Sequence, residues 1–497
     1  MDLLEGVRPK SLSFGKDGMS VKAKGKTPAD GRLLMVTATD KNYELTTEIT
    51  LGKGNTGGLL LFYDEKAYAG VASDGKTFTI YRNGEKTETM PSDYHKHFHL
   101  RLLNRANRVT LSASKDGKSW DELATDIDVS GLHHNNYGGF YALRPALLSA
   151  GKGRTTFRNF TYRNATPQEK DMAAYLMVFH QDEDHCLHAA ISRDGYTFTA
   201  LNDGKPIIAG DTIADQKGIR DPHIYRGPDG GFYLAMTDLH IYAQRDGYRD
   251  TEWERDGKTY GWGNNRGLVL MKSFDLIHWT RTNIRFDQMS KEFAQIGCAW
   301  APETVYDPVT GRMMIYFTMR FGTEQNRLYY VYVNQDFNRI ESIPQILFEY
   351  PSGASAIDGD ITPIWNEERQ KMEYHLFYVA HESGSGIKQA VSDRIDGGYR
   401  FDPRWIDFEP VACEAPNVWK RIGEDKWVLM YDIFGINPHN FGFVETSDFV
   451  HFKNLGRFNE GVMKTTNFRS PKHGAVIHLT QEEADRLENY WNGKKQK

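Results

Sequence analysis

The chain has 497 residues, too many for one ordinary hydrophobic core, so two domains are expected. Its 61 basic and 66 acidic residues give a net charge of −5, which provides no reason to expect a nucleic-acid partner. No apolar run reaches the roughly 18 residues of a membrane span. The 3 cysteines are too few and too scattered for a disulfide framework or a zinc site.

Residues 1–165 are expected to form an all-β domain. Short strand-like runs at 59–63, 68–71, 78–81 and 97–102 alternate with turn signals, and helical periodicity is absent. Many short strands at this spacing indicate a sandwich or a barrel. A last strand over 156–162 completes the domain, and one or two helical turns are expected from Pro167 onward.

After residue 173 the sequence contains five copies of a short segment, each at the expected turn between a third and a fourth strand. Its last four copies are separated by 61, 58 and 55 residues (Ser273 to Asn334, Asn334 to Ser392, Ser392 to Ser447). Units of this length with about four strands each are typical of propeller blades. The sequence therefore predicts an all-β protein: a β-sandwich over 1–165, a five-bladed β-propeller over 170–480, and a short helix with a basic tail over 481–497.

Five apolar runs headed by polar residues are expected to be the inner strands of the blades, at 218–225, 299–306, 357–361, 413–419 and 472–477. The run at 472–477 has no blade after it, and the copy at 173–200 has no inner strand before it. We therefore expect these two to pair and to close the ring. The strands converge on one axis, and their polar residues form a ring there: Asp221, Glu303, Asp358, Asp360, Glu414 and His473.

Acids that cluster in a low-dielectric funnel must be separated, hydrogen-bonded, neutralised by a cation or partly protonated. Such a setting allows one carboxyl group to stay protonated as an acid while another stays ionised as a base. Taken singly, each of these acids is more often a structural hydrogen-bond acceptor. The hypothesis of a catalytic site therefore rests on several of them acting together.

At these residues the chain resembles glycoside hydrolase family 43, five-bladed propeller enzymes that cut arabinose, xylose or galactose residues from plant polysaccharides. The resemblance covers about 173–480 and implies Asp221 as general base, Asp358 as the carboxylate that tunes pKa and orients, and Glu414 as general acid. Asp360 is an alternative to Asp358, because residues two apart in a strand share a face. Ala415 stands where the family usually has glycine. The motifs are Arg220-Asp221-Pro222, Trp300-Ala301-Pro302, Ile357-Asp358, Glu414-Ala415-Pro416 and His473-Gly474.

The same resemblance suggests residues that contact substrate or a metal. His473 resembles the family's central histidine, which helps to bind a cation or a water on the axis; a hydrogen-bonded structural histidine is the alternative. Calcium would suit oxygen ligands better than zinc, and no cofactor is required for the reaction. Trp300 is expected to provide a platform for a sugar face, Arg320 to bind sugar hydroxyls and His223 to line the pocket. Glu303 either contacts substrate as well or points away from the axis.

A long insertion over 240–266 is charged and aromatic, with Tyr248, Trp253, Tyr260 and Trp262. Loops of this length in compact domains are often functional. We expect it to wall one side of the funnel mouth and to favour an exo pocket over an open groove; an extended surface hairpin or a contact with the other domain is the alternative.

The resemblance, together with the ring of acids, implies an exo-acting, inverting glycosidase that removes arabinofuranose-, xylose- or galactose-type residues, with a carbohydrate as partner and neither nucleic acid nor membrane. The pKa of Glu414 is expected to be raised by burial and by nearby Asp358. A retaining fructosidase-like propeller would need an aspartate nucleophile in an Asn-Asp-Pro-Asn-Gly-like strand before Arg220, and no such strand precedes it. A non-catalytic carbohydrate-binding propeller would not need Asp221, Asp358 and Glu414 together.

The N-terminal domain loosely resembles the concanavalin-like sandwich that accompanies the propeller in some members of the family. Such sandwiches bind sugar, close the catalytic pocket or only stabilise the protein. The first residues, Met1-Asp2-Leu3-Leu4, have neither the basic region nor the apolar region of a signal peptide. A cytoplasmic protein is therefore expected, or a periplasmic or extracellular one if a signal was removed.

Overall fold

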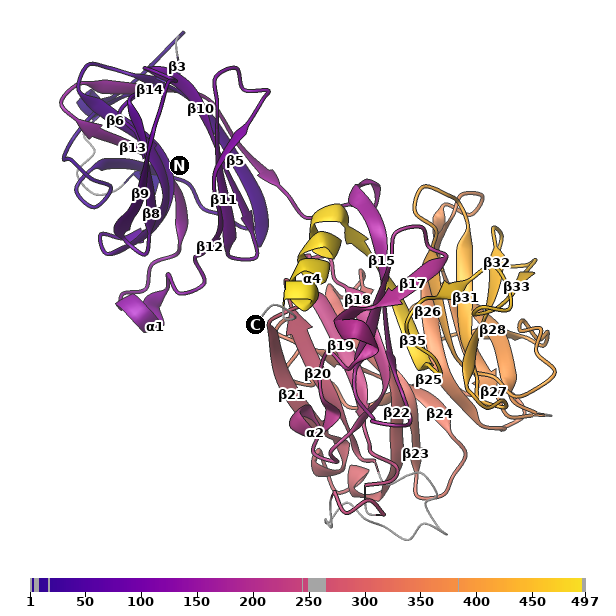
Figure 1. Ribbon diagram of the computed structural model, residues 1–497. Coiled ribbons are helices and arrows are strands. Elements are labelled where there is room, and N and C mark those ends of the chain that lie inside the picture. Colours follow the sequence, from indigo (N-terminus) through magenta and orange to yellow (C-terminus); the bar gives the residue numbers. More distant parts are fainter. Residues whose placement is uncertain are drawn as a thin grey trace. The chain divides into compact units, whose positions relative to one another are not determined.

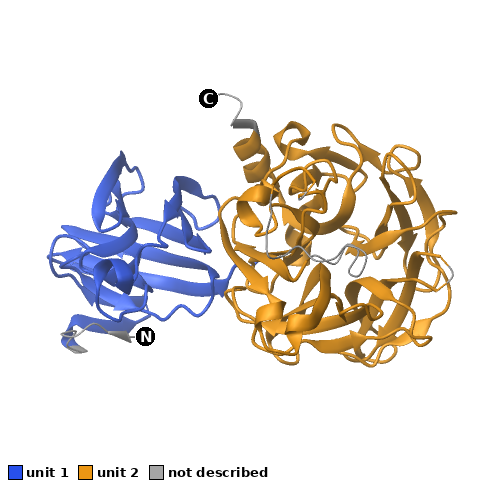
Figure 2. Cartoon of the chain, turned by 90° about the horizontal axis from the view of Figure 1, so that it is seen from below, with its two compact units in different colours: residues 1–166 blue, residues 167–497 orange. Residues whose placement is uncertain are grey.

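The computed structural model describes residues 2–3, 9–16, 18–243, 245–248, 265–382 and 384–493. The chain forms two compact units, Met1–Thr166 and Pro167–Lys497 (Figure 2). Strands dominate both units, which confirms the predicted all-β class. Across the described ranges, no helix has both the length and the apolar character that a membrane span requires.

Unit 1 is a sandwich of two seven-stranded sheets (Figure 1). In β10, Phe98, Leu100 and Leu102 are buried in the core between the sheets, and the residues between them are more exposed, as the predicted alternation requires. A single short helix, α1 (His134–Tyr137), and a 3-10 turn, η1 (Pro9–Ser11), accompany the described strands. One sheet runs in the order β1 (Asp2–Leu3), β4 (Arg32–Met35), β13 (Arg144–Gly151), β6 (Asn55–Asp64), β7 (Ala67–Ser73), β8 (Thr77–Arg82), β9 (Glu85–Pro91). The other runs in the order β12 (Asp121–Asp128), β11 (Arg108–Ser114), β10 (His97–Arg105), β5 (Asn42–Leu51), β14 (Arg154–Asn164), β3 (Gly18–Lys22), β2 (Leu12–Gly15).

Unit 2 is the predicted five-bladed propeller, with its five sheets arranged around a common axis (Figure 2). Four blades consist of four consecutive antiparallel strands, and each predicted inner strand is the first of its blade. From the axis outward they are β18 (Ile219–Arg226), β19 (Phe232–Asp238), β20 (Gly267–Ser273), β21 (Trp279–Arg285); β22 (Ile296–Asp307), β23 (Arg312–Phe321), β24 (Arg327–Val333), β25 (Gln345–Phe348); β26 (Ala356–Asn366), β27 (Lys371–Ala380), β28 (Gly386–Ser392), β29 (Arg400–Asp402); and β30 (Glu414–Lys420), β31 (Trp427–Ile433), β32 (Asn440–Thr446), β33 (Lys453–Arg457).

The fifth blade closes the ring with strands from both ends of the unit. Its inner strand β35 (Lys472–Thr480) pairs antiparallel with β15 (Met172–His180), so that the sheet has no unpaired edge at the junction. Outside these lie β16 (His188–Ser192), β17 (Thr197–Ala200) and β34 (Lys464–Thr465). This is the closure that the split first copy of the repeat predicted.

Among the described residues of unit 2, helices are few, and all except the C-terminal one have three or four residues. The turns expected from Pro167 are a single 3-10 turn, η2 (Glu169–Asp171), because Met172 already begins β15. The C-terminal helix α4 (Gln481–Gly493) packs Ala484 and Leu487 into the core of the closing blade. The remaining described helices are η3 (Leu201–Gly204), α2 (Gly210–Ile213), η4 (Phe286–Gln288) and η5 (Phe293–Gln295).

Most of the insertion after β19 lies outside the described residues, including Trp253, Tyr260 and Trp262. Its first part is described. Tyr248 contacts the His240 ring at 5.0 Å between centroids, and His240 stacks on the buried His185 at 4.0 Å. The start of the insertion is therefore attached to the turn that follows β15.

Every inner strand carries one β-bulge at the same level. At this level each strand has a residue with positive φ, an unusual conformation outside glycine, and the pairing register shifts there. The five bulge residues are Asp221 (φ 51°), Ala301 (43°), Asp358 (52°), Ala415 (53°) and His473 (36°). The residues just before them form a rim level, namely Arg220, Trp300, Ile357, Glu414 and Lys472. The residues two positions after them form a channel level, namely His223, Glu303, Asp360, Asn417 and Ala475.

Candidate active site

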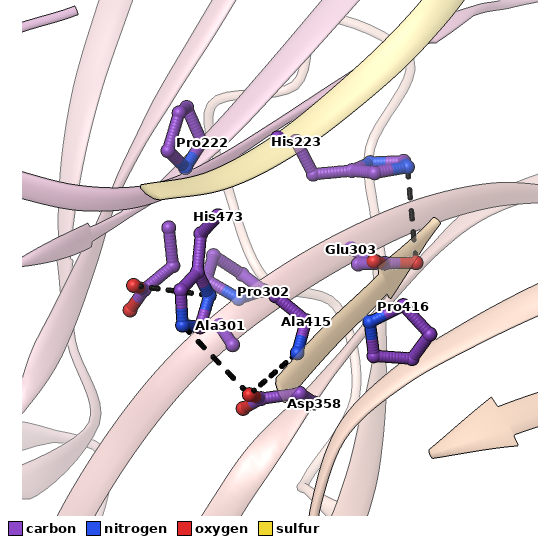
Figure 3. Close-up of a pocket in the computed structure, with 11 residues that line it drawn as sticks. Pro222, His223, Ala301, Pro302, Glu303, Asp358, Ala415, Pro416 and His473 are labelled. Atoms are coloured by element: carbon purple, nitrogen blue, oxygen red, sulfur yellow. Dashed lines mark hydrogen bonds and ion pairs between the residues drawn. The ribbon is translucent and has the colours of Figure 1, made fainter. Parts of the chain in front are cut away.

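A small cavity lies on the propeller axis between the bulge level and the channel level (Figure 3). Its volume of ≈ 20 Å³ is enough for a single water molecule. Three bulge residues, Asp221, Asp358 and His473, and two channel residues, His223 and Glu303, provide its polar lining. The folded chain therefore gathers five of the nine predicted site residues around one point.

His473 stands between the predicted base and the predicted acid. Its Nδ1 lies 3.2 Å from Oδ1 of Asp221, and its Nε2 lies 3.0 Å from Oε1 of Glu414. Asp358 Oδ2 is 3.9 Å from the same Nε2 (Figure 3). Burial alone would lower the pKa of His473, but the three carboxylates outweigh it and raise the pKa to about 10. At neutral pH the ring is therefore an imidazolium that faces a carboxylate on each side.

Asp221 has the environment that a general base needs. Its Oδ2 accepts a hydrogen bond of 2.7 Å from the Thr237 hydroxyl, and Arg220 Nε lies 4.0 Å from its Oδ1. Burial raises the pKa of this carboxyl, but His473 and Arg220 outweigh burial and hold it below its usual value. Asp221 is therefore ionised at neutral pH.

The pKa of Glu414 differs from the expectation that burial and Asp358 raise it. Lys472 Nζ lies 3.2 Å from its Oε1, the same oxygen that His473 approaches. Burial raises its pKa, but His473 and Lys472, with Arg220, outweigh burial and hold the pKa below the usual range. The predicted rise is wrong because the groups that reach Glu414 are two cations at the start of β35, and their effect exceeds that of a neighbouring acid.

Asp358 and Asp360 point to the axis at different depths. Asp358 Oδ2 accepts the main-chain N–H of Ala415 at 3.2 Å, and burial, with Glu414 and Asp221, raises its pKa to about 7 against the effect of His473 (Figure 3). Both oxygens of Asp360 are held by the blades: Oδ1 by the Thr362 hydroxyl, and Oδ2 by Asn417 and the Val418 N–H. Asp358 lines the cavity and Asp360 does not, which supports Asp358 as the modulator.

The bulge N–H groups are bonded in a repeated way that positions the site. At four blade interfaces the N–H of the bulge residue donates to a side chain on the second strand of the preceding blade. The pairs are Asp221 with His180 Nδ1, Ala301 with Thr237 Oγ1, Asp358 with Thr318 Oγ1 and His473 with Asp432 Oδ2. At the remaining interface the equivalent residue is Val379, which has no acceptor, and the N–H of Ala415 donates to Asp358 instead.

The channel level holds His223, Glu303 and Asp360 close together, yet it does not fit a metal ion. His223 Nδ1 accepts the Thr304 N–H at 3.1 Å, and burial lowers the pKa of His223 to about 3. The neutral ring therefore carries its proton on Nε2, the nitrogen 3.8 Å from Glu303, and a protonated nitrogen cannot bind a cation. Glu303 thus faces the axis; burial, with the Asp360 charge, raises its pKa well above the usual value.

A calcium ion bound directly to His473 does not fit the described residues either. Calcium takes about six to eight oxygen ligands at roughly 2.3–2.6 Å. Here the ring nitrogens of His473 already face Asp221 and Glu414, and the Lys472 ammonium lies beside Glu414. A single water molecule fits the cavity and its mixed donors and acceptors better than an ion does.

Trp300 and Arg320 lie together but do not line the cavity. The guanidinium of Arg320 is 5.4 Å from the centre of the Trp300 ring, a cation–π distance, and Trp300 occupies the rim level. Sequence reasoning assigned no role to four charged residues of the site. Arg220 and Lys472 contact the predicted acids Asp221 and Glu414. Asp182 and Asp432 pair in turn with Arg220 and Lys472. Arg220 and Lys472 each stand directly before a bulge residue, so alignment of the five inner strands would have found them.

Comparison with known proteins places residues 170–485 in a family related to glycoside hydrolase family 43 and described as a probable glycosyl hydrolase domain. An α-L-arabinofuranosidase of Bifidobacterium longum subsp. longum is 28% identical over 193 residues, which are 37% of this chain and only 16% of that protein. An exo-1,5-α-L-arabinanase structure from a bovine ruminal metagenomic library is 16% identical, with a TM-score of 0.37 over 55% of this chain and 89% of that one. An endo-arabinase structure from Bacteroides thetaiotaomicron is 14% identical, with a TM-score of 0.39 over 55% and 88%.

Proposed function

From the premise that this chain belongs to the family of probable glycosyl hydrolases related to family 43, we propose that it is an exo-acting, inverting glycosidase that releases arabinofuranose-type residues from plant polysaccharides or oligosaccharides. The observation that carries the proposal is the placement of an ionised Asp221 and of Glu414 on opposite sides of His473. The arabinose-type substrate is suggested by the name of the B. longum relative. Xylose- and galactose-type residues are the alternatives to test beside it.

The two carboxyl groups suit an inverting reaction. Inverting enzymes keep them about 6.5–9.5 Å apart so that a water fits between base and sugar, whereas retaining enzymes keep them about 5–5.5 Å apart. Here the width of an imidazole ring and contacts of 3.2 Å and 3.0 Å separate Asp221 from Glu414. Their strands, β18 and β30, are separated in the ring by β35, which contacts both.

In this proposal Asp221 removes a proton from a water that attacks the anomeric carbon, and Glu414 protonates the leaving oxygen. Glu414 is ionised in the free site. A bound sugar excludes water and offers a glycosidic oxygen that accepts a hydrogen bond only from the protonated carboxyl, and both effects raise its pKa. Asp358, held by Ala415, supplies negative charge in its ionised form near the positive charge that develops on the sugar ring.

The exo assignment depends on the insertion over 240–266. The described start of the insertion stacks on the His185 ring. His185 lies in the turn that follows β15, directly after Asp184 and two residues after Glu183. Most of the insertion lies outside the described residues, and the exo assignment is a prediction from its length and composition. An exo enzyme releases single sugars, whereas an open groove would release longer oligosaccharides.

The proposal is tested by hydrolysis of nitrophenyl α-L-arabinofuranoside, β-xyloside and galactosides, with Asp221→Asn as the inactive control. We expect the arabinofuranoside to be cleaved fastest and the variant to lose at least 100-fold, on the order of a general-base contribution. A folded wild-type protein that cleaves none of these substrates, or a fully active Asp221→Asn protein, would contradict it. Product sizes from arabinan distinguish exo from endo action.

A further inference from the structure

Lys472, the rim residue of β35, and the fully buried Asp432 lie beside Glu414, and neither has a role in the mechanism proposed above. Lys472 Nζ lies 3.2 Å from Glu414 Oε1 and 3.4 Å from Asp432 Oδ2. Lys472 is 4% exposed and Asp432 is 0% exposed. A lysine so deeply buried is rare unless it is paired, and here it is paired on two sides.

The position of this lysine follows from the bulges. Glu414 and Asp432 are directly opposite each other on β30 and β31, an arrangement of like charges that is unfavourable by itself. Lys472 is the rim residue of the adjacent inner strand β35, so its side chain reaches between the two carboxylates. The N–H of His473 donates to the same Asp432 oxygen at 3.3 Å, which fixes the start of β35 and with it the lysine.

Asp432 has the character of an anchor and not of a second acid at the reaction centre. Its Oδ2 receives Lys472 and the His473 N–H, whereas its Oδ1 is buried and has no hydrogen-bond partner among the described residues. An unpaired buried carboxylate oxygen is costly, and the ion pair between Asp432 and Lys472 offsets that cost. The charge of Asp432 is therefore useful where it stands, next to Lys472.

The contacts of Glu414 are one-sided. Lys472 Nζ and His473 Nε2 both make their closest approach to Oε1, and among the described residues no hydrogen bond to Oε2 is seen. Two donors on one oxygen fix the rotation of the carboxyl group. When Glu414 is protonated, Oε1 still accepts hydrogen bonds from these two donors. The proton is therefore carried by Oε2, which faces away from both donors.

We propose that Lys472, anchored by Asp432, is a positioning residue that holds Oε1 of Glu414 and thereby turns Oε2 toward the glycosidic oxygen of the substrate. The inference rests on the proposed role of Glu414 as general acid. Lys472 does not touch the substrate; it acts through Glu414. A misdirected acid matters most when the leaving group needs a proton, because activated leaving groups depart without one.

The test compares nitrophenyl α-L-arabinofuranoside, whose leaving group is activated, with methyl α-L-arabinofuranoside, whose leaving group is poor. The variants are Lys472→Met, Lys472→Arg, Asp432→Asn and Glu414→Gln. Lys420→Met serves as the control, since Lys420 lies at the other end of β30 and pairs with Glu169 at 2.8 Å. Thermal unfolding of each variant monitors folding.

We expect Lys472→Met to lower kcat on the methyl glycoside by about 30- to 100-fold, part of a general-acid contribution, and on the nitrophenyl glycoside by less than about threefold. KM should change little on either substrate, Lys472→Arg should recover most of the loss, and Asp432→Asn should reproduce it in part. Lys420→Met should behave as wild type. If Lys472→Met fails to fold, the same contrast between substrates is measured on Asp432→Asn.

Two failures are distinguishable. If Glu414→Gln affects both glycosides equally, Glu414 is not the general acid and the proposed function itself is wrong in that respect. If Glu414→Gln discriminates between the leaving groups but folded Lys472→Met and Asp432→Asn do not, Glu414 keeps its role and the positioning by Lys472 is overturned.

Discussion

The main-chain N–H of Ala415 donates a hydrogen bond of 3.2 Å to Oδ2 of Asp358. At the other blade interfaces the corresponding N–H is bonded to a side chain of the preceding second strand, such as Thr237 or Thr318. Val379 occupies that place before Ala415 and has no acceptor. At this interface, the hydrogen bond that links the two blades is therefore accepted by a carboxylate of the site, Asp358. This bond holds the Asp358 side chain at the axis.

Because Asp358 replaces a side-chain acceptor at position 379, the effect of its mutation on stability can be predicted, and so can the variant that restores the lost stability. Asp358→Ala should be less stable than Asp358→Asn by about 1–3 kcal/mol, because alanine leaves the buried Ala415 N–H without an acceptor and asparagine does not. Val379→Thr should restore most of that loss in the Asp358→Ala background and little in the Asp358→Asn background. Urea unfolding of the four proteins measures it; equal effects in both backgrounds would show that the N–H is not the cause.

The propeller and the order of its inner strands were predictable because they depend on repetition and on apolar runs, which a single sequence displays directly. The charge state of Glu414 was not. This charge state depends on Lys472 and His473, which lie 58 and 59 residues after Glu414 in the chain. They reach Glu414 only because β35 is adjacent to β30 in the ring. The bulges add a second difficulty: a positive φ at a non-glycine residue such as Asp221 or Ala415 leaves no mark in the sequence pattern.

Asp360 illustrates the same limit in a different way. Strand alternation predicts that Asp360 shares a face with Asp358, but the bulge at Asp358 interrupts the alternation, and the pattern does not show which of the two carboxylates neighbouring blades engage. The bonds from Asn417 and the Val418 N–H decide this, and both come from another strand.

Closure of the ring should depend on Arg421. This arginine is 2% exposed, pairs with Glu445 at 2.5 Å, donates to the Gly195 carbonyl at 3.3 Å and lies 4.1 Å from the Tyr196 ring. It thereby connects the fourth blade of the chain to the closing blade. Arg421→Met should lower the free energy of unfolding by about 3 kcal/mol, because it leaves the largely buried Glu445 with Lys426, 4.0 Å away, in place of its close partner.

The control for that variant is Arg404→Met, which removes an exposed arginine that pairs with Asp402. Exposed pairs contribute little, so the midpoint of denaturation should hardly move. A similar shift for both variants would indicate a general effect of losing a cation and would contradict a special role for Arg421 in closure.

The pH dependence of stability should report on His473. Its pKa is raised from 6.5 to about 10 by Asp221, Glu414 and Asp358. A raised pKa in the folded state stabilises the protein fully below pH 6.5, and this contribution is lost as the pH rises from 6.5 through about 10. The wild type should therefore lose stability over this window, and His473→Gln should show a flatter curve there. Chemical denaturation at several pH values checks it, and parallel curves for the two proteins would contradict it.

The stereochemistry of the product tests the assignment of both carboxyl groups together. With Asp221 as base and Glu414 as acid on either side of the His473 ring, water attacks the face of the sugar opposite the leaving group, and the anomeric configuration inverts. An α-L-arabinofuranoside should therefore first yield the β-anomer of free arabinose. Proton NMR in the first minutes, before mutarotation, distinguishes the anomers. First formation of the α-anomer would require a covalent intermediate on one of the two carboxylates, so that neither Asp221 as general base nor the present spacing argument could stand.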